Sequence, residues 1–440
     1  MSADFSEIFA PGFVERPFWW EDGPPLPAPT PLPDETDVAI IGGGIAGLST
    51  AVELGRAGVK SVVLDREAIG WGASSRNGGA LSGAGSLGRA KSNLQQAVDP
   101  KLLAEMVEEA EASFDEFEAL IEREQLDCHY RRCGRFVGAH APKALDMLKR
   151  RADMLNAAGR DDAEILTRDR LEEEIATDRY HGGLVIQRAG SVHPALYTRG
   201  LAAAAKRLGA TLCSGVDVKG WTQTGGRFAV ETNHGVVRAG TIMVATNGYT
   251  GAATPWHRRR LIPVPSYMIA TEPLGEARVR ANLRNARVYG DTKKILYYFR
   301  PSPDRSRILF GGRASFVDTD VRRAGARLHR FLTHLLPDLR GVKITHAWRG
   351  NVAFAVDMLP HVGERDGVHF ALGCNGSGVV TMTHLGRCAA RQIIGGDNRP
   401  SAFSRLPFPT LPFYDGRPWF MPAVGTWYRM QDRLDGWKVG

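Results

Sequence analysis

The sequence predicts an α/β fold in which a Rossmann-type domain for a dinucleotide is joined to an α+β domain built on a mostly antiparallel sheet. Three observations lead to this prediction. An apolar strand near the start of the chain runs into a Gly-x-Gly-x-x-Gly turn. A second strand, glycine-rich turn and helix follow at residues 370–394. Between them, residues 256–345 alternate short strands with one helix over 322–335.

The first of these motifs has the spacing of a dinucleotide site. The strand covers residues 37–41, and Asp65 ends a second strand 23 residues after Gly42, where about 20 is expected. Gly42 allows the tight turn, Gly44 lets the backbone approach a pyrophosphate, and Gly47 lets the helix lie against the sheet. The helix N-terminus offers free amides to phosphates, and the Asp65 carboxylate can accept hydrogen bonds from a ribose diol.

The second glycine turn, at residues 373–378, favours a flavin over a nicotinamide cofactor. A reduced flavin carries negative charge along its N1–C2=O edge, and a helix N-terminus with free amides stabilises that charge. A nicotinamide enzyme needs no second turn of this kind so far along the chain. The alternative is a C-terminal helix that only completes the sheet.

The composition indicates a globular protein without a membrane anchor. The chain has 440 residues, enough for two intertwined domains, and is 43% hydrophobic and 24% charged. No apolar run is long enough to cross a bilayer, and no basic residue precedes Arg16 to begin a secretory signal. The five cysteines include no Cys-x-x-Cys spacing. We therefore expect a cytoplasmic protein with no disulfide framework and no metal.

The net charge of +8 indicates either a field that attracts an anionic substrate or cofactor, or only a solvated surface, which is the favoured interpretation. The densest basic cluster, residues 258–260, lacks interleaved aromatic residues, so we expect no nucleic-acid partner. The sequence carries no signal for an oligomeric state.

The N-terminal 33 residues predict an irregular strap. Prolines alternate through residues 24–33, which must be extended because proline excludes a helix there. Trp19 and Trp20 are expected to pin the strap to the body of the protein. The alternative is an SH3-type ligand segment. Farther along the chain, hydrophobic periodicity predicts helices over 100–124, 142–159, 195–208 and 381–394, and strands over 133–139, 210–218, 228–232, 236–239 and 241–246.

Residues 69–79, Ile-Gly-Trp-Gly-Ala-Ser-Ser-Arg-Asn-Gly-Gly, resemble the GxGAS-x-RNGG stretch of the FAD-dependent D-amino-acid/glycine oxidase superfamily, and are most similar to its γ-glutamylputrescine oxidase branch. Further stretches agree with that branch in family order: residues 176–180, 191–194, 245–249, 297–300, 309–312, 348–350, 359–363 and 376–387.

The resemblance implies a glutathione-reductase-like FAD domain and a division of the chain into seven segments. These are a proline-rich strap (1–33), the FAD-binding domain in three parts (34–95, 181–255 and 346–396), a helical insertion of the substrate domain (96–180), the substrate domain (256–345) and a C-terminal extension (397–440).

The resemblance also implies the residues that hold FAD. The ADP half is expected at Gly42, Gly44, Gly47, Asp65 and Arg66, the adenine at the backbone of Val218, and the ribityl chain at Ala245 and Thr246. The pyrophosphate and the isoalloxazine are expected along Ala73, Ser74, Ser75, Asn77, Gly78 and Gly79, and the flavin O2 at Gly376, Ser377, Gly378 and Val379. Two residues have a structural alternative: Arg76 as a bridge from this loop to the sheet, and Asn77 as a turn residue.

Three departures from the relatives matter. Residues 351–360 hold no cysteine where sarcosine-oxidase relatives attach FAD covalently, so we expect non-covalent FAD. Ser82 and Val380 stand where those relatives clamp a substrate carboxylate, which disfavours a simple N-methylglycine. Leu309 stands near the position of their oxygen-activating lysine, which leaves oxidase and dehydrogenase open.

The implied reaction is hydride transfer from a carbon bearing a neutral amine to flavin N5, followed by hydrolysis of the imine and reduction of O2 to H2O2. The candidate catalytic residues are Tyr298, Trp348 and Asn375, and Arg300 is expected to bind an acidic tail of the amine beside Tyr298 and Trp348. Core packing for Trp348 and a salt bridge for Arg300 are the structural alternatives. His193, His346 and His384 are expected to be structural.

Two other functions compete with an amine oxidase. One is a flavin amino-acid dehydrogenase that passes electrons to a quinone. The other is a binding module with non-catalytic FAD, whose ligand segment would be the proline-rich strap.

Overall fold

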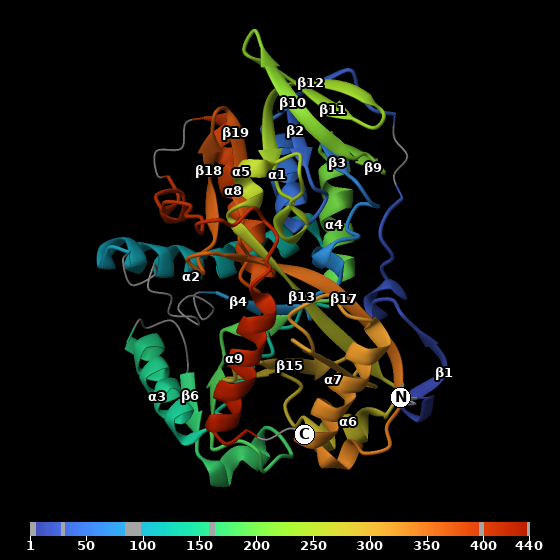
Figure 1. Ribbon diagram of the computed structural model, residues 1–440, viewed down its shortest axis with the longest axis vertical. Coiled ribbons are helices and arrows are strands. Elements are labelled where there is room, and N and C mark those ends of the chain that lie inside the picture. Colours follow the sequence, from blue (N-terminus) through green and yellow to red (C-terminus); the bar gives the residue numbers. More distant parts are fainter. Residues whose placement is uncertain (1–5, 28–30, 84–97, 158–162, 396–399, 438–440) are drawn as a thin grey trace.

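The computed structural model describes residues 6–27, 31–83, 98–157, 163–395 and 400–437. Two large sheets form the molecule, one in the upper half of Figure 1 and one in the lower half. The helices are α1 (Ile45–Arg56), α2 (Pro100–Glu124), α3 (Pro142–Ala157), α4 (Pro194–Arg207), α5 (Pro255–Arg258), α6 (Glu276–Asn282), α7 (Val321–Leu335), α8 (Gly378–Ile394) and α9 (Met421–Leu434).

The upper sheet has eight strands in the order β10-β11-β12-β2-β3-β9, with β19 beside β12 and β18 beside β19. β2, β3, β9, β12 and β19 are mutually parallel, as in a Rossmann domain. The strands are β2 (Glu35–Ile41), β3 (Ser61–Asp65), β9 (Thr211–Ser214), β10 (Val218–Thr224), β11 (Arg227–Thr232), β12 (Gly235–Val244), β18 (His361–Arg365) and β19 (Val368–Leu372).

Both faces of this sheet are apolar, because each face packs against a different hydrophobic core. In β2, Val38 and Ile40 face a core formed with α1, α4 and α8, whereas Ala39 and Ile41 face a second core that includes Phe228 from the β10–β12 meander. Successive residues of a strand point to opposite faces, so a strand that is buried on both sides reads as a continuous apolar run.

The lower sheet has nine mostly antiparallel strands in the order β1-β17-β13-β16-β15-β14-β5-β7-β6. α7 covers one face with Leu328 and Leu332, and the opposite face contacts the loop after β3, since the indole of Trp348 donates to the carbonyl of Arg76. The strands are β1 (Phe9–Val14), β5 (Arg135–Gly138), β6 (Ala163–Leu166), β7 (Gly183–Ile186), β13 (Leu261–Thr271), β14 (Val288–Asp291), β15 (Tyr297–Pro301), β16 (Ile308–Gly312) and β17 (Ile344–Ala355); β4 (Ala80–Ser82) and β8 (Ala189–Ser191) form a separate pair.

Most predicted helices have nearly the expected bounds, but α8 begins at Gly378 rather than at 381. The prediction of a single helix in residues 256–345 was wrong, because α6 and part of α5 lie there besides α7, and α9 was not predicted. α2 covers the expected residues 100–124, because Asp99 accepts hydrogen bonds from the backbone N–H groups of Lys101 and Leu102 and Pro100 occupies the first turn. The predicted strands 236–239 and 241–246 are one strand, β12. Gly240 stays extended within it, where an added Cβ would lie 2.9 Å from the carbonyl oxygen of Asp37 on β2.

Two strands belong to a different sheet from the one that the expected domain division implies. β7 lies within 181–255 and β17 begins before 346 and extends to 355, yet both strands pair in the nine-stranded sheet rather than in the eight-stranded sheet. Local periodicity defines a strand but not its partner, since pairing depends on residues far away in the sequence.

The strap is built into the lower domain. β1 pairs parallel with β17, and Trp19 is fully buried against Ala195, Met268 and Trp348. The predicted anchoring by Trp19 and Trp20 is therefore confirmed, whereas strand β1 was not predicted. Part of the proline run, residues 28–30, lies outside the described residues.

Candidate functional site

The turn between β2 and α1 is formed by glycines that no larger residue fits. Gly42 has φ of +110°, and an added Cβ would lie 2.8 Å from the carbonyl oxygen of Ala245. At Gly47 an added Cβ would lie 2.1 Å from the carbonyl oxygen of Gly42, so the helix begins in direct contact with its own turn. Gly44 is the N-cap of α1 and has no side chain with which to cap the helix, so the first amides are available to other partners.

Asp65 closes the turn from the next strand. Its Oδ2 accepts a hydrogen bond from the backbone N–H of Gly43 (2.8 Å) and its Oδ1 accepts one from Glu67 (2.9 Å). Burial raises the pKa of Asp65 to about 6. Each carboxylate oxygen keeps a further lone pair, so the group can still accept hydrogen bonds from ribose hydroxyls. The chain returns beside it, because the N–H of Val216 donates to the carbonyl of Asp65 (2.8 Å), two residues before Val218.

The loop after β3 folds over the start of α1. Ser74 Oγ accepts a hydrogen bond from the N–H of Ile45 (3.0 Å), and an added Cβ on Gly44 would lie 2.7 Å from the same oxygen. Asn77 donates to the carbonyl of Ser74 (2.8 Å) and accepts from the N–H of Gly79 (2.7 Å). Both bonds are to the backbone of its own loop, so Asn77 acts as a turn residue, which was its structural alternative.

Arg76 ties this loop to the nine-stranded sheet. Its guanidinium lies between Trp71 and Trp20, at 4.2 and 4.5 Å from their ring centroids, and donates to the carbonyls of Trp71 (2.7 Å) and Arg349 (3.1 Å). Burial lowers its pKa. The structural alternative for Arg76, a bridge from the loop to the sheet, is confirmed.

A second helix N-terminus, that of α8, belongs to the same site. The turn before it places Asn375 and Gly376 in the left-handed region, with φ of +49° and +86°. Ser377 is the N-cap but makes no side-chain capping bond, because its Oγ lies 3.0 Å from Ser82 Oγ instead. The amides at the start of α8 are therefore open to a bound group, as those of α1 are.

α1 and α8 cross closely, which fixes the two N-termini relative to each other. Thr50 Oγ1 donates to the carbonyl of Gly386 (2.8 Å), and an added Cβ on Gly386 would lie 2.3 Å from the carbonyl oxygen of Ala46. Both helices lie on one face of the β2–β3 sheet (Figure 1). The residues expected to hold FAD come together here, and most of them are half-buried rather than closed off: Gly42, Gly44, Asp65, Ala73, Ser74, Asn77, Gly78, Thr246, Ser377 and Gly378.

A row of side chains on the nine-stranded sheet faces the glycine loop. Trp348, Met268, Gly311 and Tyr298 are cross-strand neighbours in this order. The Trp348 indole N–H donates to the carbonyl of Arg76 (2.8 Å). An added Cβ on Gly78 would lie 3.3 Å from Cδ2 of Tyr298, so the Tyr298 ring borders the loop directly.

Of the expected substrate-side residues, Tyr298 alone is half-buried with its ring against the glycine loop. Its hydroxyl lies 2.9 Å from Ser266 Oγ, and burial raises its pKa to about 12. Trp348 is 1% exposed. Asn375 donates to the carbonyl of Gly373 (2.8 Å) and accepts from the N–H of Ala355 (2.9 Å), so its amide braces the α8 turn.

Arg300 is buried rather than open to the loop. It donates to the backbone carbonyls of Val192 (2.8 Å) and Pro301 (3.1 Å), and burial lowers its pKa to about 10. Neither bond is the carboxylate salt bridge that was the alternative for this residue. An added Cβ on Gly79 would lie 2.9 Å from Arg300 Nη1, so the guanidinium supports the end of the glycine loop.

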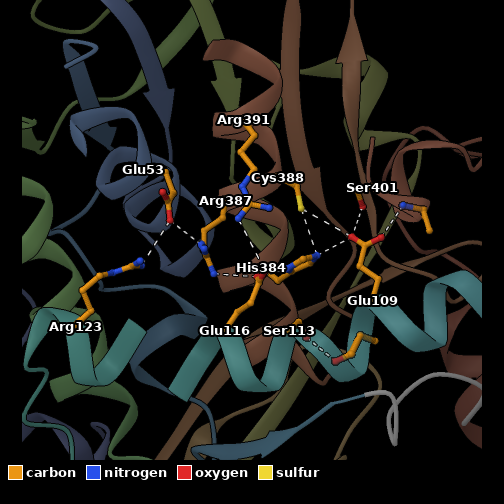
Figure 2. Close-up of polar contacts among 12 residues, drawn as sticks. Glu53, Glu109, Ser113, Glu116, Arg123, His384, Arg387, Cys388, Arg391 and Ser401 are labelled. Carbon is orange, nitrogen blue, oxygen red and sulfur yellow. Dashed lines mark hydrogen bonds and ion pairs between the residues drawn. The ribbon is translucent and has the colours of Figure 1, made fainter. Parts of the chain in front are cut away.

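A polar network beneath the site joins α2 to α8 and was not predicted (Figure 2). His384 Nε2 lies 2.7 Å from Glu109 and its Nδ1 lies 3.0 Å from Glu116, which Arg387 also contacts (2.9 Å). Although burial opposes the charged imidazole, Cys388 and the two carboxylates hold the pKa of His384 well above its usual range. Single ligand atoms of Glu109, His384 and Cys388 lie within 4.8 Å of one another, but His384 and Arg387 already balance the charge of the carboxylates.

The expected structural roles of two further histidines hold. His193 caps α4 by accepting a hydrogen bond at Nδ1 from the N–H of Leu196 (3.2 Å), and burial lowers its pKa to about 4. His346 Nε2 lies 3.0 Å from Glu21 of the strap, without hydrogen-bond geometry. Neither ring reaches the glycine loops in a described contact.

The comparisons with known proteins identify the class. Residues 37–392 match the family of FAD-dependent oxidoreductases described as DAO, and the chain belongs to this family. The predicted family, fold class and FAD cofactor are thereby confirmed. In the described part of the chain, none of the helices combines the length and apolarity needed to cross a bilayer.

Particular relatives are similar over nearly the whole chain. The gamma-glutamylputrescine oxidoreductase of Escherichia coli (strain K12) is 33% identical over 408 residues, which cover 90% of this chain and 93% of that protein. The glycine oxidase of Geobacillus kaustophilus (strain HTA426) is 24% identical over 383 residues, 84% of this chain and 96% of that enzyme. A crystal structure of glycine oxidase from Geobacillus kaustophilus superposes with a TM-score of 0.72 at 21% identity, covering 86% of this chain and 99% of that one, which shows a shared fold.

Proposed function

We propose that this protein is an oxidase that uses non-covalent FAD to oxidise a C–N bond of an amine or amino-acid-like substrate. The neutral amine loses a hydride from carbon and a proton from nitrogen, and the resulting imine takes up water and separates into an aldehyde or ketone and an amine. When bound, FAD supplies the acceptor for the hydride and passes the two electrons to O2, which leaves as H2O2.

One observation carries the proposal: the N-termini of α1 and α8, whose own N-cap residues make no side-chain capping bond, are held in a fixed crossing beside a row of glycine turns. The first suits a pyrophosphate and the second suits the negative edge of a reduced flavin. The similarity to a gamma-glutamylputrescine oxidoreductase and a glycine oxidase supports an amine as the substrate.

The proposed FAD ligands follow from this arrangement. The α1 turn and Ser74 lie along the pyrophosphate, Asp65 binds the ribose, and the backbone of Val218 lies at the adenine. Arg66, whose side chain is exposed, borders the ADP half. Ala245 and Thr246 lie along the ribityl chain, and Gly376 to Val379 provide amides for the flavin O2.

On the substrate side, Tyr298 is the residue best placed to contact the amine. Its raised pKa keeps the phenol neutral at physiological pH, so it can orient a substrate by hydrogen bonding without adding charge. The apolar surroundings of this face favour the unprotonated amine, because burial penalises an ammonium. Trp348 acts by holding the Arg76 loop in place, and Asn375 by fixing the turn of α8.

A second candidate function is a dehydrogenase that passes electrons to a quinone. The observation that favours it is Leu309, which is fully buried in one hydrophobic cluster with Met268 and Trp348, at the position expected for an oxygen-activating lysine. The two candidates differ in how fast air restores the oxidised flavin.

The experiment is a visible spectrum of the purified protein during anaerobic incubation with γ-glutamylated polyamines, N-methyl amino acids, D-amino acids and aminophosphonates. Bleaching by one class identifies the substrate, and rapid recovery in air with release of H2O2 supports the oxidase. Slow recovery supports the dehydrogenase. A bound flavin that no amine bleaches would contradict both and favour a non-catalytic FAD.

The mode of FAD attachment needs a separate test. Residues 351–360 contain no cysteine, and Cys374, the cysteine in the α8 turn, directs its Sγ toward the carbonyl of Ala353 (3.7 Å). Acid precipitation is expected to leave the yellow colour in the supernatant. Colour that stays with the protein pellet would show a covalent flavin.

A further inference from the structure

Arg313 lies just beyond β16 on the sheet face that turns toward the glycine loop. By strand alternation it continues the face of Leu309 and Gly311, and Gly311 is the cross-strand neighbour of Tyr298. The side chain is half-buried. Within the described ranges, no hydrogen bond and no ion pair with an acidic side chain engages its guanidinium.

The surroundings of this guanidinium are aromatic and apolar. Its Cζ lies 4.8 Å from the ring centroid of Phe354, in a cluster that includes Phe316 and residues Met421 and Tyr428 of α9. Burial lowers the pKa of Arg313, and the phenols of Tyr428 and Tyr298 act against this shift. Burying a positively charged guanidinium among aromatic rings costs free energy unless an anion pairs with it.

Residues around this guanidinium contact both glycine turns of the candidate site. On one side, Tyr298 borders Gly78. On the other, Phe354 follows Val352 on the same face of β17, and Val352 Cγ1 would be 3.8 Å from a Cβ on Gly376. Arg313 therefore lies on the same sheet face as the residues that contact the loop and the turn.

The C-terminal extension contributes residues of α9 to the aromatic cluster around Arg313. α9 lies outside residues 37–392, the part that matches the family, and it descends along the lower domain in Figure 1. Tyr428 contacts Phe316 edge to face with a centroid distance of 5.8 Å. Part of the cluster around Arg313 thus comes from α9, a segment outside the residues that match the family.

We propose that Arg313, enclosed by Phe354 and Tyr428, binds a carboxylate on the substrate at a distance from the oxidised C–N bond. The planar guanidinium offers parallel N–H donors that match the two oxygens of a carboxylate. Arg300 lacks this freedom, because it already donates to two backbone carbonyls. The inference rests on the proposed function and narrows it to amines with an acidic tail.

The test measures binding of an unreactive probe to the FAD-loaded protein. Glutarate and its neutral diamide, glutaramide, are titrated while the flavin spectrum and the heat of binding are followed. We expect glutarate to bind at least about 10-fold more tightly than glutaramide, Arg313→Gln to remove this preference, and Arg313→Lys to keep part of it. Arg429→Gln, which removes a charge from the exposed side of α9, is the matched control and leaves the preference intact.

Turnover adds a second, independent readout. For the amine that bleaches the flavin, Arg313→Gln is expected to raise KM by about 10-fold or more, and to have no such effect on the same amine with its acid converted to an amide. Equal affinity for glutarate and glutaramide, or unchanged glutarate binding in a folded Arg313→Gln variant with full FAD, would overturn the inference. If no amine bleaches the flavin while glutarate binds through Arg313, the proposed function fails and the anion site stands.

Discussion

The space above Gly44 determines whether the α1 turn can accept a phosphate. An added Cβ would already lie 2.7 Å from Ser74 Oγ, which accepts the hydrogen bond of Ile45. Gly44→Val is expected to displace Ser74, cover the helix amides and produce a folded protein without flavin. The ratio of visible to ultraviolet absorbance measures this loss, with circular dichroism as the control for folding. A fully yellow variant would show that the phosphates lie elsewhere.

Single residues also show where sequence reasoning ends. The glycines, Asp65, Ser74 and Asn77 were predictable, because each is required by local backbone geometry or by a short motif. Arg300 lies on β15 and Arg313 directly follows the neighbouring strand β16, and no local sequence signal distinguishes their roles. Arg300 is bound to Val192, which is 108 positions away in the chain, and Arg313 is enclosed by α9. Such differences arise only from tertiary packing.

Among the elements, the N-terminus of α4 depends on the protonation of one histidine. His193 must be neutral at Nδ1 to accept the hydrogen bond of Leu196, and burial holds its pKa near 4 in the folded state. The unfolded chain therefore binds a proton between pH 6.5 and 4 that the folded chain excludes, so stability falls as pH decreases through this window.

His193→Asn is expected to flatten this pH dependence. Asparagine is a good N-cap without a proton to gain, so the capping bond persists at both pH values. From pH 7 to pH 5 the wild type should lose on the order of 2 kcal/mol through this group, since one pKa unit corresponds to about 1.4 kcal/mol. Urea unfolding at both pH values measures the difference. Equal losses in wild type and variant would show that His193 does not titrate in this way.

The crossing of α1 and α8 is the second element on which the site depends. Because a Cβ on Gly386 would lie 2.3 Å from the carbonyl oxygen of Ala46, Gly386→Val must separate the two helices and with them the two open N-termini. We expect a destabilisation of about 2 kcal/mol or more and weaker FAD binding. The matched control is Gly220→Val on β10, where an added Cβ meets nothing within 4 Å. Equal effects of the two substitutions would contradict a special role for the crossing.

The positions of helices and strands along the chain were predicted better than the pairing between strands. α2 and α7 had clear periodicity and caps, so their ends lie within a residue of the expected ones. β1, with the sequence Phe-Ala-Pro-Gly-Phe-Val, has no strand signal of its own and exists because β17 offers it an edge. The assignment of β7 and β17 to the lower sheet has the same origin.

At the scale of the whole molecule, the strap links both domains. Trp19 is fully buried in the lower domain, and the Trp20 indole donates to Ser75 in the loop after β3 (2.9 Å). Deleting residues 1–33 is therefore expected to lower both thermal stability and FAD content, since removing one buried tryptophan costs about 3–5 kcal/mol by itself. Calorimetry and flavin absorbance measure these changes. A deletion that keeps both values would support a detachable ligand segment.

The pairing of β1 with β17 also has a consequence for synthesis of the chain. The register joins Phe9 to Ile344, so β1 is synthesised roughly 330 residues before the strand with which it pairs. Until β17 has been made, β1 and Trp19 have no partner. After that, the edge of β17 stays unpaired until β1 binds to it. Contacts between such distant residues form slowly, and unpaired edges aggregate in the meantime. Closure of this edge is therefore the step at which a nascent chain is most exposed to self-association.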